Sequence, residues 1–368
     1  MYAFILVIVL MQSLLLLGHW LLYRTVIRFL DITNPAVIMG MRIGLTVLSL
    51  SFVLASLLVF KYHNQFVKLF YVIASSWLGF FYYLAWAVVL LWFLYGVAGL
   101  IGWHVDFRIF AAVLIAAAVA TGTYGIINAR EIRVKKIDVS LPNLPDAWKN
   151  KTVVWTSDLH LGAVRGEAFS RKVAALIDEQ HPDIVFIGGD LFDGVAGDYP
   201  RLAGPMAKLN APQGTYFITG NHEEFNDKNK FLSVIKELKI NILDNQMVDI
   251  DGIQVVGVDY KDSENKMRYH EILSDLKIDR SKPSILLKHA PDLLATAESF
   301  GISLQLSGHT HVGQVWPNKA ITRKVFKGFD YGFKRYKDMA VNTSSGTGTW
   351  GLPMRVGANP EIVVIRFE

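Results

Sequence analysis

Residues 152–162 read TVVWTSDLHLG, and this stretch decides the fold of the C-terminal part of the chain. Its first five residues are β-branched or apolar, which is typical of a buried strand. Asp158 and His160 follow directly, in the loop that leaves the strand. Because ligands of open α/β sheets collect at the carboxyl ends of strands, the stretch predicts a strand that delivers a carboxylate and an imidazole to a site.

The same theme recurs after residue 130: a short apolar strand, a polar loop and an amphipathic helix. Strands that alternate with helices predict an α/β domain with helices on both faces of a central sheet. The predicted strands are Ile132–Leu141, Thr152–Thr156, Ile184–Gly188, Thr215–Thr219, Ile253–Val258, Ser284–Leu287, Ser303–Leu306, Met339–Asn342 and Glu361–Arg366. The predicted helices are Ala168–Glu179, Phe231–Leu238, Met267–Leu276 and Pro291–Phe300.

Five of these strands are followed at once by Asp, Asn or His, and five of the ten histidines lie in those loops. Each fragment alone is a weak signal, because a Gly-Asp after a strand is usually a turn and a lone buried histidine usually belongs to the core. Their coincidence at five strand ends predicts one shared site. The other histidines are interpreted as interfacial or surface residues: His19, His63, His104, His181 and His270.

Imidazole together with carboxylate suits Mn, Fe or Zn, whereas Mg and Ca prefer mostly oxygen ligands. Seven candidate ligands are too many for one tetrahedral ion but suit two ions that share a bridge. Two ions roughly 3.5–4 Å apart can clamp a phosphoryl group and generate hydroxide at neutral pH. The loops therefore predict a two-metal site.

The first 128 or so residues are almost entirely apolar and aromatic, and they raise the hydrophobic share of the 368-residue chain to 52% and its mean hydropathy to +0.31. Crossing a bilayer takes roughly 20 apolar residues, and four segments are long enough. We predict a transmembrane helical region over residues 1–129 and a soluble domain over 130–368. The predicted spans are Ala3–Tyr23, Ala36–Phe60, Leu69–Ile101 and Ile109–Ala129, of which the third exceeds the bilayer thickness.

The chain is therefore predicted to be an integral multi-pass membrane protein. A cleaved signal peptide is the alternative for the first segment, but that segment has no basic n-region and three more spans follow. Cations flank the spans on both sides, with Lys61 and Lys68 on one side and Arg24 and Arg28 on the other. Each set favours a different orientation, so the side that carries the soluble domain stays open.

The formal charge of +5 is mildly basic, but Lys and Arg form no stripe along a helix, so nucleic-acid binding is not expected. Cations that face anionic lipid next to the spans explain the charge better. The chain has no cysteine, which excludes disulfides and thiolate catalysis. Nothing in the sequence indicates an oligomeric state.

In chain order, the five loops read Asp-x-His, Gly-Asp-x-x-Asp, Gly-Asn-His-Glu, a solitary His and Gly-His-x-His. From Lys151 to the C-terminus the chain thereby resembles the calcineurin-like metallophosphoesterases. It most resembles their membrane-associated branch, the transmembrane proteins with a metallophosphoesterase domain. There, SDLHLG follows soon after the last apolar segment, and a tail similar to residues 344–353 precedes the last strand. The resemblance implies a four-layer αββα sandwich, in which two sheets are flanked by helices.

The resemblance also implies that this site hydrolyses a phosphoester or pyrophosphate bond with metal-activated hydroxide. His222 would stabilise or protonate the leaving oxygen, and Asp193 would orient the site. No ligand position is substituted. The implied ligands are Asp158, His160 and His311 for the first divalent ion, Asn221, His289 and His309 for the second, and Asp190 as a bridge between them.

The spans make an amphiphilic phosphate a plausible substrate. Some similar membrane-associated enzymes cleave the pyrophosphate of UDP-2,3-diacylglucosamine in lipid A synthesis, and this is the leading specific candidate. The stretch Arg323–Lys337 mixes cations with aromatics and is predicted to be a loop, either dipping into a headgroup layer or simply solvated. A tethered phosphodiesterase or phosphatase for soluble substrates is one alternative, and a non-catalytic membrane scaffold is another, disfavoured by the intact ligand set.

Overall fold

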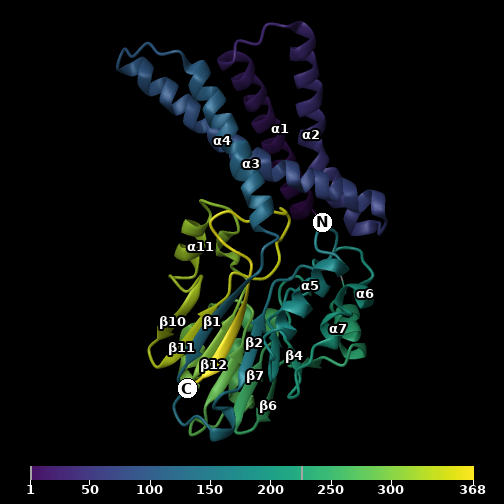
Figure 1. Ribbon diagram of the computed structural model, residues 1–368, viewed down its shortest axis with the longest axis vertical. Coiled ribbons are helices and arrows are strands. Elements are labelled where there is room, and N and C mark those ends of the chain that lie inside the picture. Colours follow the sequence, from purple (N-terminus) through teal and green to yellow (C-terminus); the bar gives the residue numbers. More distant parts are fainter. Residues whose placement is uncertain (1, 225–226) are drawn as a thin grey trace. The chain divides into compact units, whose positions relative to one another are not determined.

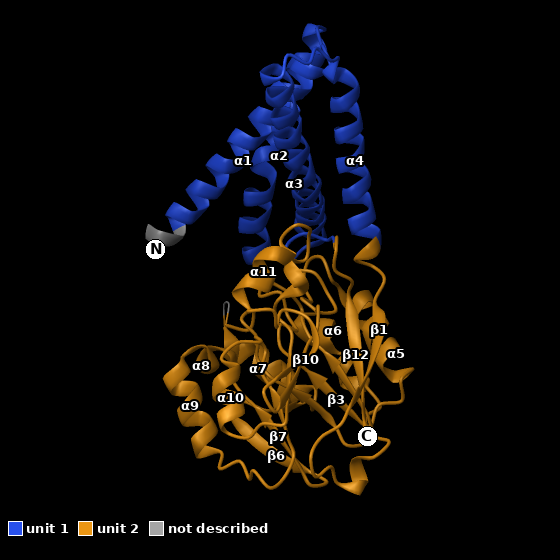
Figure 2. Cartoon of the chain, turned by 90° about the vertical axis from the view of Figure 1, so that its left-hand side faces the viewer, with its two compact units in different colours: residues 1–127, 351–354 blue, residues 128–350, 355–368 orange. Residues whose placement is uncertain are grey.

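The computed structural model describes residues 2–224 and 227–368. The chain forms two compact units, coloured separately in Figure 2. One comprises Met1–Ile127 together with the short segment Gly351–Met354, and the other comprises Asn128–Trp350 and Arg355–Glu368.

The first unit is helical, and its helices confirm the four predicted apolar segments. They are α1 (Tyr2–Phe29), α2 (Pro35–Lys61), α3 (Gln65–Leu100) and α4 (Phe107–Asn128), and each is long and apolar enough to cross a membrane. The side chains of Asn34 and Asn64 cap the first backbone N–H groups of α2 and α3, which explains where these helices begin.

Small residues let these helices approach one another. A Cβ on Gly18 of α1 would lie 2.6 Å from the ring of Phe81 in α3, and one on Gly122 of α4 would lie 2.5 Å from the ring of Phe80. Glycine at such contacts is common in membrane helices, whose association depends on close van der Waals packing.

The second unit contains two six-stranded sheets, where the residue pattern alone predicted one central sheet (Figure 1). The first sheet has the order β1-β12-β2-β3-β4-β5 and the second the order β10-β11-β9-β8-β7-β6. The strands of the first sheet are β1 (Arg133–Val139), β12 (Glu361–Phe367), β2 (Thr152–Thr156), β3 (Ile184–Ile187), β4 (Thr215–Phe217) and β5 (Asn241–Ile242). Those of the second are β10 (Gly332–Tyr336), β11 (Met339–Thr343), β9 (Leu304–Ser307), β8 (Ser284–Leu287), β7 (Ile253–Gly257) and β6 (Gln246–Ile250).

Alternate side chains of these strands fill different layers. In β2, Val153 and Trp155 belong to the core between the sheets, whereas Val154 faces the helices outside the first sheet. In β8, Ile285 lies in the same central core and Leu286 packs on the outer helices of the second sheet. The period of two therefore buries both faces of each sheet, and the unit is the four-layer αββα sandwich that the resemblance implied.

Helices cover both outer faces. On the first sheet lie α5 (Glu167–Asp178), α6 (Tyr199–Ala203) and α7 (Lys228–Glu237), and on the second lie α9 (Lys266–Asp275) and α10 (Leu294–Ser299). The other short helices are α8 (Tyr260–Glu264) and α11 (Lys319–Val325), with 3-10 turns at Asp146–Trp148, Met206–Lys208 and His311–Gly313.

The prediction of a loop over Arg323–Lys337 is wrong. That stretch contains the end of α11 and the edge strand β10, which pairs antiparallel with β11. Its cations and aromatics show no regular alternation of apolar and polar residues, which is why the sequence did not indicate a strand. Such alternation is not required of an edge strand that is largely exposed on both faces.

Parallel pairing sets the position of the predicted site loops. β2, β3 and β4 run parallel to one another in the first sheet, as do β7, β8 and β9 in the second. Their carboxyl ends therefore lie on one side of the sandwich, and the loops that carry Asp, Asn and His converge there.

Candidate metal centre

Several ligand candidates in the site loops have a left-handed backbone conformation, which is unusual for residues other than glycine. The φ angles are +56° at Asp158, +49° at His160, +50° at Asp190 and +68° at His309. Backbone hydrogen bonds hold the loops against each other, from Asp158 N–H to Gly189 O at 3.0 Å and from His160 N–H to Asp190 O at 3.0 Å. Strained backbone of this kind clusters at functional sites, where the surrounding structure fixes it.

Two glycines of the motifs are required by close approach. A Cβ on Gly220 would lie 2.2 Å from Asp190 Oδ1, and a Cβ on Gly308 would lie 2.3 Å from Asp158 Oδ2. These contacts bring the Gly-Asn-His-Glu and Gly-His-x-His loops directly onto the two carboxylates.

Asp158, His160 and His311 form the first cluster, and all three are buried. The two imidazoles point their Nε2 atoms at each other across 3.0 Å, and His311 Nε2 lies 3.5 Å from Asp158 Oδ1. One ligand atom from each residue lies within 4.8 Å of the others, which is the spacing expected around one ion.

Asp190, His289 and His309 form the second cluster, again with ligand atoms within 4.8 Å of one another. His289 Nε2 lies 3.3 Å from Asp190 Oδ2, and Asn221 joins through its Oδ1, 2.9 Å from His309 Nδ1. Asp190 Oδ2 also lies 3.8 Å from His160 Nε2 in the first cluster. Asp190 thus stands between the two groups, as the proposed bridge requires.

The electrostatics of this site fit bound cations. His289 Nε2 is fully buried and has no hydrogen-bond partner among the described residues, although its Nδ1 is 2.7 Å from Gly188 O. Burial alone would raise the pKa of Asp190, but the neighbouring His289 and His160 hold it well below its usual range. Burial and His289 lower the pKa of His309 to about 4. Burial also lowers the pKa of His289, but the charges of Asp190 and Asp158 outweigh it and raise that pKa to about 9. A set of imidazoles and carboxylates of this kind suits Mn, Fe or Zn.

His160, Asp193 and His222 form a third group beside the first cluster. Asp193 Oδ1 lies 3.5 Å from His160 Nδ1 and 3.8 Å from His222 Nδ1. His222 Nδ1 is also 3.1 Å from the carbonyl oxygen of Asp193, which favours the tautomer protonated at Nδ1. The structure thus brings all nine predicted site residues into one constellation.

Glu223, the last residue of the Gly-Asn-His-Glu motif, has a role that only the structure reveals. Its buried carboxylate accepts hydrogen bonds from the N–H groups of Asp190 at 2.9 Å, Gly220 at 2.8 Å and Phe192 at 3.2 Å. Burial, with the nearby charge of Asp190, raises the pKa of Glu223 to about 7. Glu223 therefore ties the backbone of the Asp190 loop to that of the Asn221 loop.

Arg355 was missed altogether, since no motif marks it. Its fully buried guanidinium donates to the carbonyl oxygens of Ser345 at 2.7 Å and Gly348 at 2.6 Å, and its Nη1 donates to His311 O at 3.1 Å. Burial lowers its pKa to about 10, so it remains charged at neutral pH. Arg355 therefore links the loop that contains Ser345 and Gly348 to the backbone of His311, a metal-ligand candidate.

Arg355→Met is expected to destabilise the protein by roughly 3 kcal/mol or more, because each buried carbonyl left without a donor costs about 1–3 kcal/mol. Thermal unfolding in detergent should show a melting temperature lower by on the order of 10 °C. Arg335→Met is the matched control, since Arg335 is exposed and its Nη1 donates a long hydrogen bond of 3.4 Å to Asp338 O. Equal melting temperatures for the two variants would contradict the assigned role of Arg355.

Three aromatic side chains border histidines of the candidate site. The ring of Tyr260 lies 5.6 Å from that of His289, the ring of Phe326 lies 5.9 Å from that of His309, and the ring of Trp350 lies 5.9 Å from that of His222. These side chains come from three separate segments, so only the tertiary fold reveals that they share a border.

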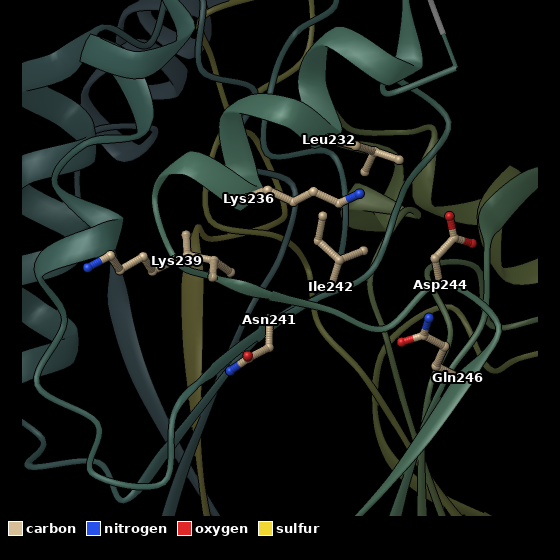
Figure 3. Close-up of a pocket in the computed structure, with 8 residues that line it drawn as sticks. Leu232, Lys236, Lys239, Asn241, Ile242, Asp244 and Gln246 are labelled. Carbon is tan, nitrogen blue, oxygen red and sulfur yellow. The ribbon is translucent and has the colours of Figure 1, made fainter.

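A surface pocket of about 600 Å³ lies elsewhere in this unit, between α7 and the edge strand β5 (Figure 3). Leu232, Lys236, Ile242 and Asp244 are among the residues that line it, and none of the nine predicted site residues does. Its lining carries no combination of metal ligands, so the converging loops remain the candidate centre.

Comparison with known proteins identifies the family. Residues 151–313 match the family model described as calcineurin-like phosphoesterase. A Campylobacter jejuni protein described as an uncharacterised metallophosphoesterase is 34% identical over 239 residues, covering 64% of this chain and 63% of that protein. The chain thus spans just under two thirds of that relative's length.

Two further relatives match a larger share of this chain. An Aquifex aeolicus metallophosphoesterase is 33% identical over 259 residues, which cover 68% of this chain and 97% of that protein. A Danio rerio protein named transmembrane protein with metallophosphoesterase domain is 32% identical over 273 residues, covering 69% of this chain and 61% of that protein. The chain therefore belongs to the calcineurin-like phosphoesterase family, in its membrane-associated branch.

Proposed function

We propose that this chain is a membrane-anchored phosphoesterase that uses two divalent metal ions to hydrolyse a phosphoester or pyrophosphate bond. The observation that carries the proposal is the pair of buried ligand clusters with Asp190 between them. Bound at these clusters, two ions would polarise the phosphoryl group and supply hydroxide at neutral pH. Asp158, His160 and His311 would hold one ion, and Asn221, His289 and His309 the other.

The chain's own residues would complete the reaction. His222 would hold its Nδ1–H toward the Asp193 carbonyl, and in the doubly protonated form its Nε2–H would stabilise or protonate the leaving oxygen. Asp193 would orient both His160 and His222, since its Oδ1 lies within 3.8 Å of a nitrogen of each. The buried surroundings strengthen these interactions by excluding water.

For the substrate we propose an amphiphilic phosphate, with UDP-2,3-diacylglucosamine as the leading specific candidate. Four helices that can cross a membrane support this choice, because in an integral multi-pass membrane protein they would hold the site where lipids are concentrated. A soluble phosphodiester is the second candidate, since a two-metal site handles esters and anhydrides alike.

Hydrolysis by the full-length protein in detergent tests both statements. With added Mn, we expect turnover of bis-p-nitrophenyl phosphate and a strong preference for UDP-2,3-diacylglucosamine. Turnover of the aryl diester alone would keep the phosphoesterase and discard the lipid substrate. A protein that binds two ions and cleaves neither compound would favour the non-catalytic scaffold.

A further inference from the structure

Exposed apolar side chains are unevenly distributed over the second unit. Among its described residues, large apolar side chains are exposed at only six positions. Three of them, Trp316, Ile321 and Val325, lie in the segment that follows the metal-ligand candidate His311. A fourth, Trp350, is hydrogen-bonded to Gln314 of that segment. The six are Met267, Trp316, Ile321, Val325, Phe333 and Trp350. Exposed apolar side chains gathered in one segment are typical of an interaction site.

Helix α11 (Lys319–Val325) carries part of this surface, and its two sides differ. Ile321 and Val325 are 63% and 62% exposed and stand four residues apart, so they share one face. Lys319 and Arg323, also four residues apart, share another. The helix is too short to be stable by itself in water, yet it presents an apolar stripe beside cations to solvent.

The charge of this segment has one sign. From Trp316 to Phe329 the sequence contains no acidic residue. Its four cations are exposed, and none forms an ion pair with a described residue: Lys319, Arg323, Lys324 and Lys327. Apolar side chains flanked by unpaired cations are the composition of surfaces that lie in the headgroup layer of an anionic membrane.

The same segment is joined to the metal centre at both ends. Gln314 pairs with the backbone of Trp350 through bonds of 2.8 and 2.9 Å, and Trp350 in turn lies against His222. Beyond the C-terminal end of α11, Phe326 lies against His309. A contact made by this surface is therefore a contact made at the border of the candidate site.

We propose that Trp316, Ile321, Val325 and the four cations, here called the α11 surface, dock onto an anionic lipid bilayer, with the apolar side chains entering the headgroup layer. The bilayer is the one that the chain's own four helices are suited to enter. Docking presents the metal centre to phosphates at the membrane surface. The inference rests on the helices lying in a bilayer and does not depend on hydrolysis, because its test needs no turnover.

The absence of cysteine allows this surface to be probed at one site in the full-length chain. Ile321→Cys is labelled with a fluorophore sensitive to polarity and reconstituted into vesicles of phosphatidylcholine, with or without phosphatidylglycerol. Nitroxide lipids then report contact with the headgroup region. Met267→Cys is the matched control, since Met267 is 72% exposed and apolar but lies on α9, remote in sequence from the α11 surface.

We expect blue-shifted, nitroxide-quenched fluorescence at position 321 in vesicles with phosphatidylglycerol, and little quenching at position 267. Replacing Lys319, Arg323, Lys324 and Lys327 together by Gln should remove the dependence on anionic lipid, since each cation near such a surface contributes about fivefold to binding. High salt should weaken quenching for the same reason.

Two results would overturn the proposal. The first is water-exposed, unquenched fluorescence at position 321 in anionic vesicles. The second is blue-shifted fluorescence that nitroxide lipids do not quench and whose shift increases with the protein density in the vesicles. That result would assign the α11 surface to contact between copies of this chain.

Discussion

Asp190→Ala is expected to lower turnover by at least about 10³-fold and to reduce bound metal to one ion or none per chain. The carboxylate of Asp190 approaches both clusters, at 3.3 Å from His289 Nε2 and 3.8 Å from His160 Nε2. Its removal takes away the proposed bridging anion, while Asp158 stays 3.5 Å from His311 Nε2 and 3.9 Å from His289 Nε2. Metal content by elemental analysis and turnover of the aryl diester measure the two effects.

Loss of the fold must be separated from loss of metal, because Asp190 Oδ1 also accepts a hydrogen bond from His222 N–H at 2.8 Å. Asp190→Asn keeps an oxygen at that position and removes only the charge, so it should fold and still lose metal. Asp338→Ala, at an exposed turn residue, should change neither property. Full activity in Asp190→Ala would remove the two-metal assignment.

His222→Ala is expected to cut turnover by about 10²–10⁴-fold while both ions stay bound, because a positioned proton donor contributes that much and a non-ligand leaves the metals in place. The difference between the two variants is therefore qualitative: Asp190 variants lose metal, and His222 variants keep it. Burial, together with the nearby His160, lowers the pKa of His222 in the metal-free site, which favours its neutral form there.

A second substitution distinguishes proton donation from support of the loop. His222→Asn keeps a donor that can reach the Asp193 carbonyl but cannot protonate a leaving oxygen, so it should be as slow as His222→Ala. His270→Ala is the matched histidine control, because His270 is exposed on α9 and packs on Phe300. A metal-depleted His222→Ala protein would mean that His222 is a ligand, as its grouping with His160 and Asp193 also permits.

Two buried residues that hold the site loops together could not be assigned this role from the sequence. Asp158, Asp190 and His309 were recognisable because each follows a strand in a loop with glycine or a second ligand. Glu223 and Arg355 bond mainly to backbone atoms, and such contacts leave no spacing in the sequence. Their roles became visible only when the loops were seen to pack on one another.

The sequence by itself determined most of the local elements and the expected chemistry: which segments are apolar enough for a bilayer, where nine of the strands lie, and which loops carry candidate metal ligands. These follow from short-range periodicity and residue type, which act within a few residues of the chain. The sequence did not reveal the strands β5, β6 and β10. Tertiary structure decided what depends on long-range pairing. It divided the strands between two sheets, made Arg323–Lys337 part of a helix and an edge strand, and placed Asp190 between two clusters. Those outcomes depend on which buried faces meet, and that is a property of the whole chain rather than of any one segment.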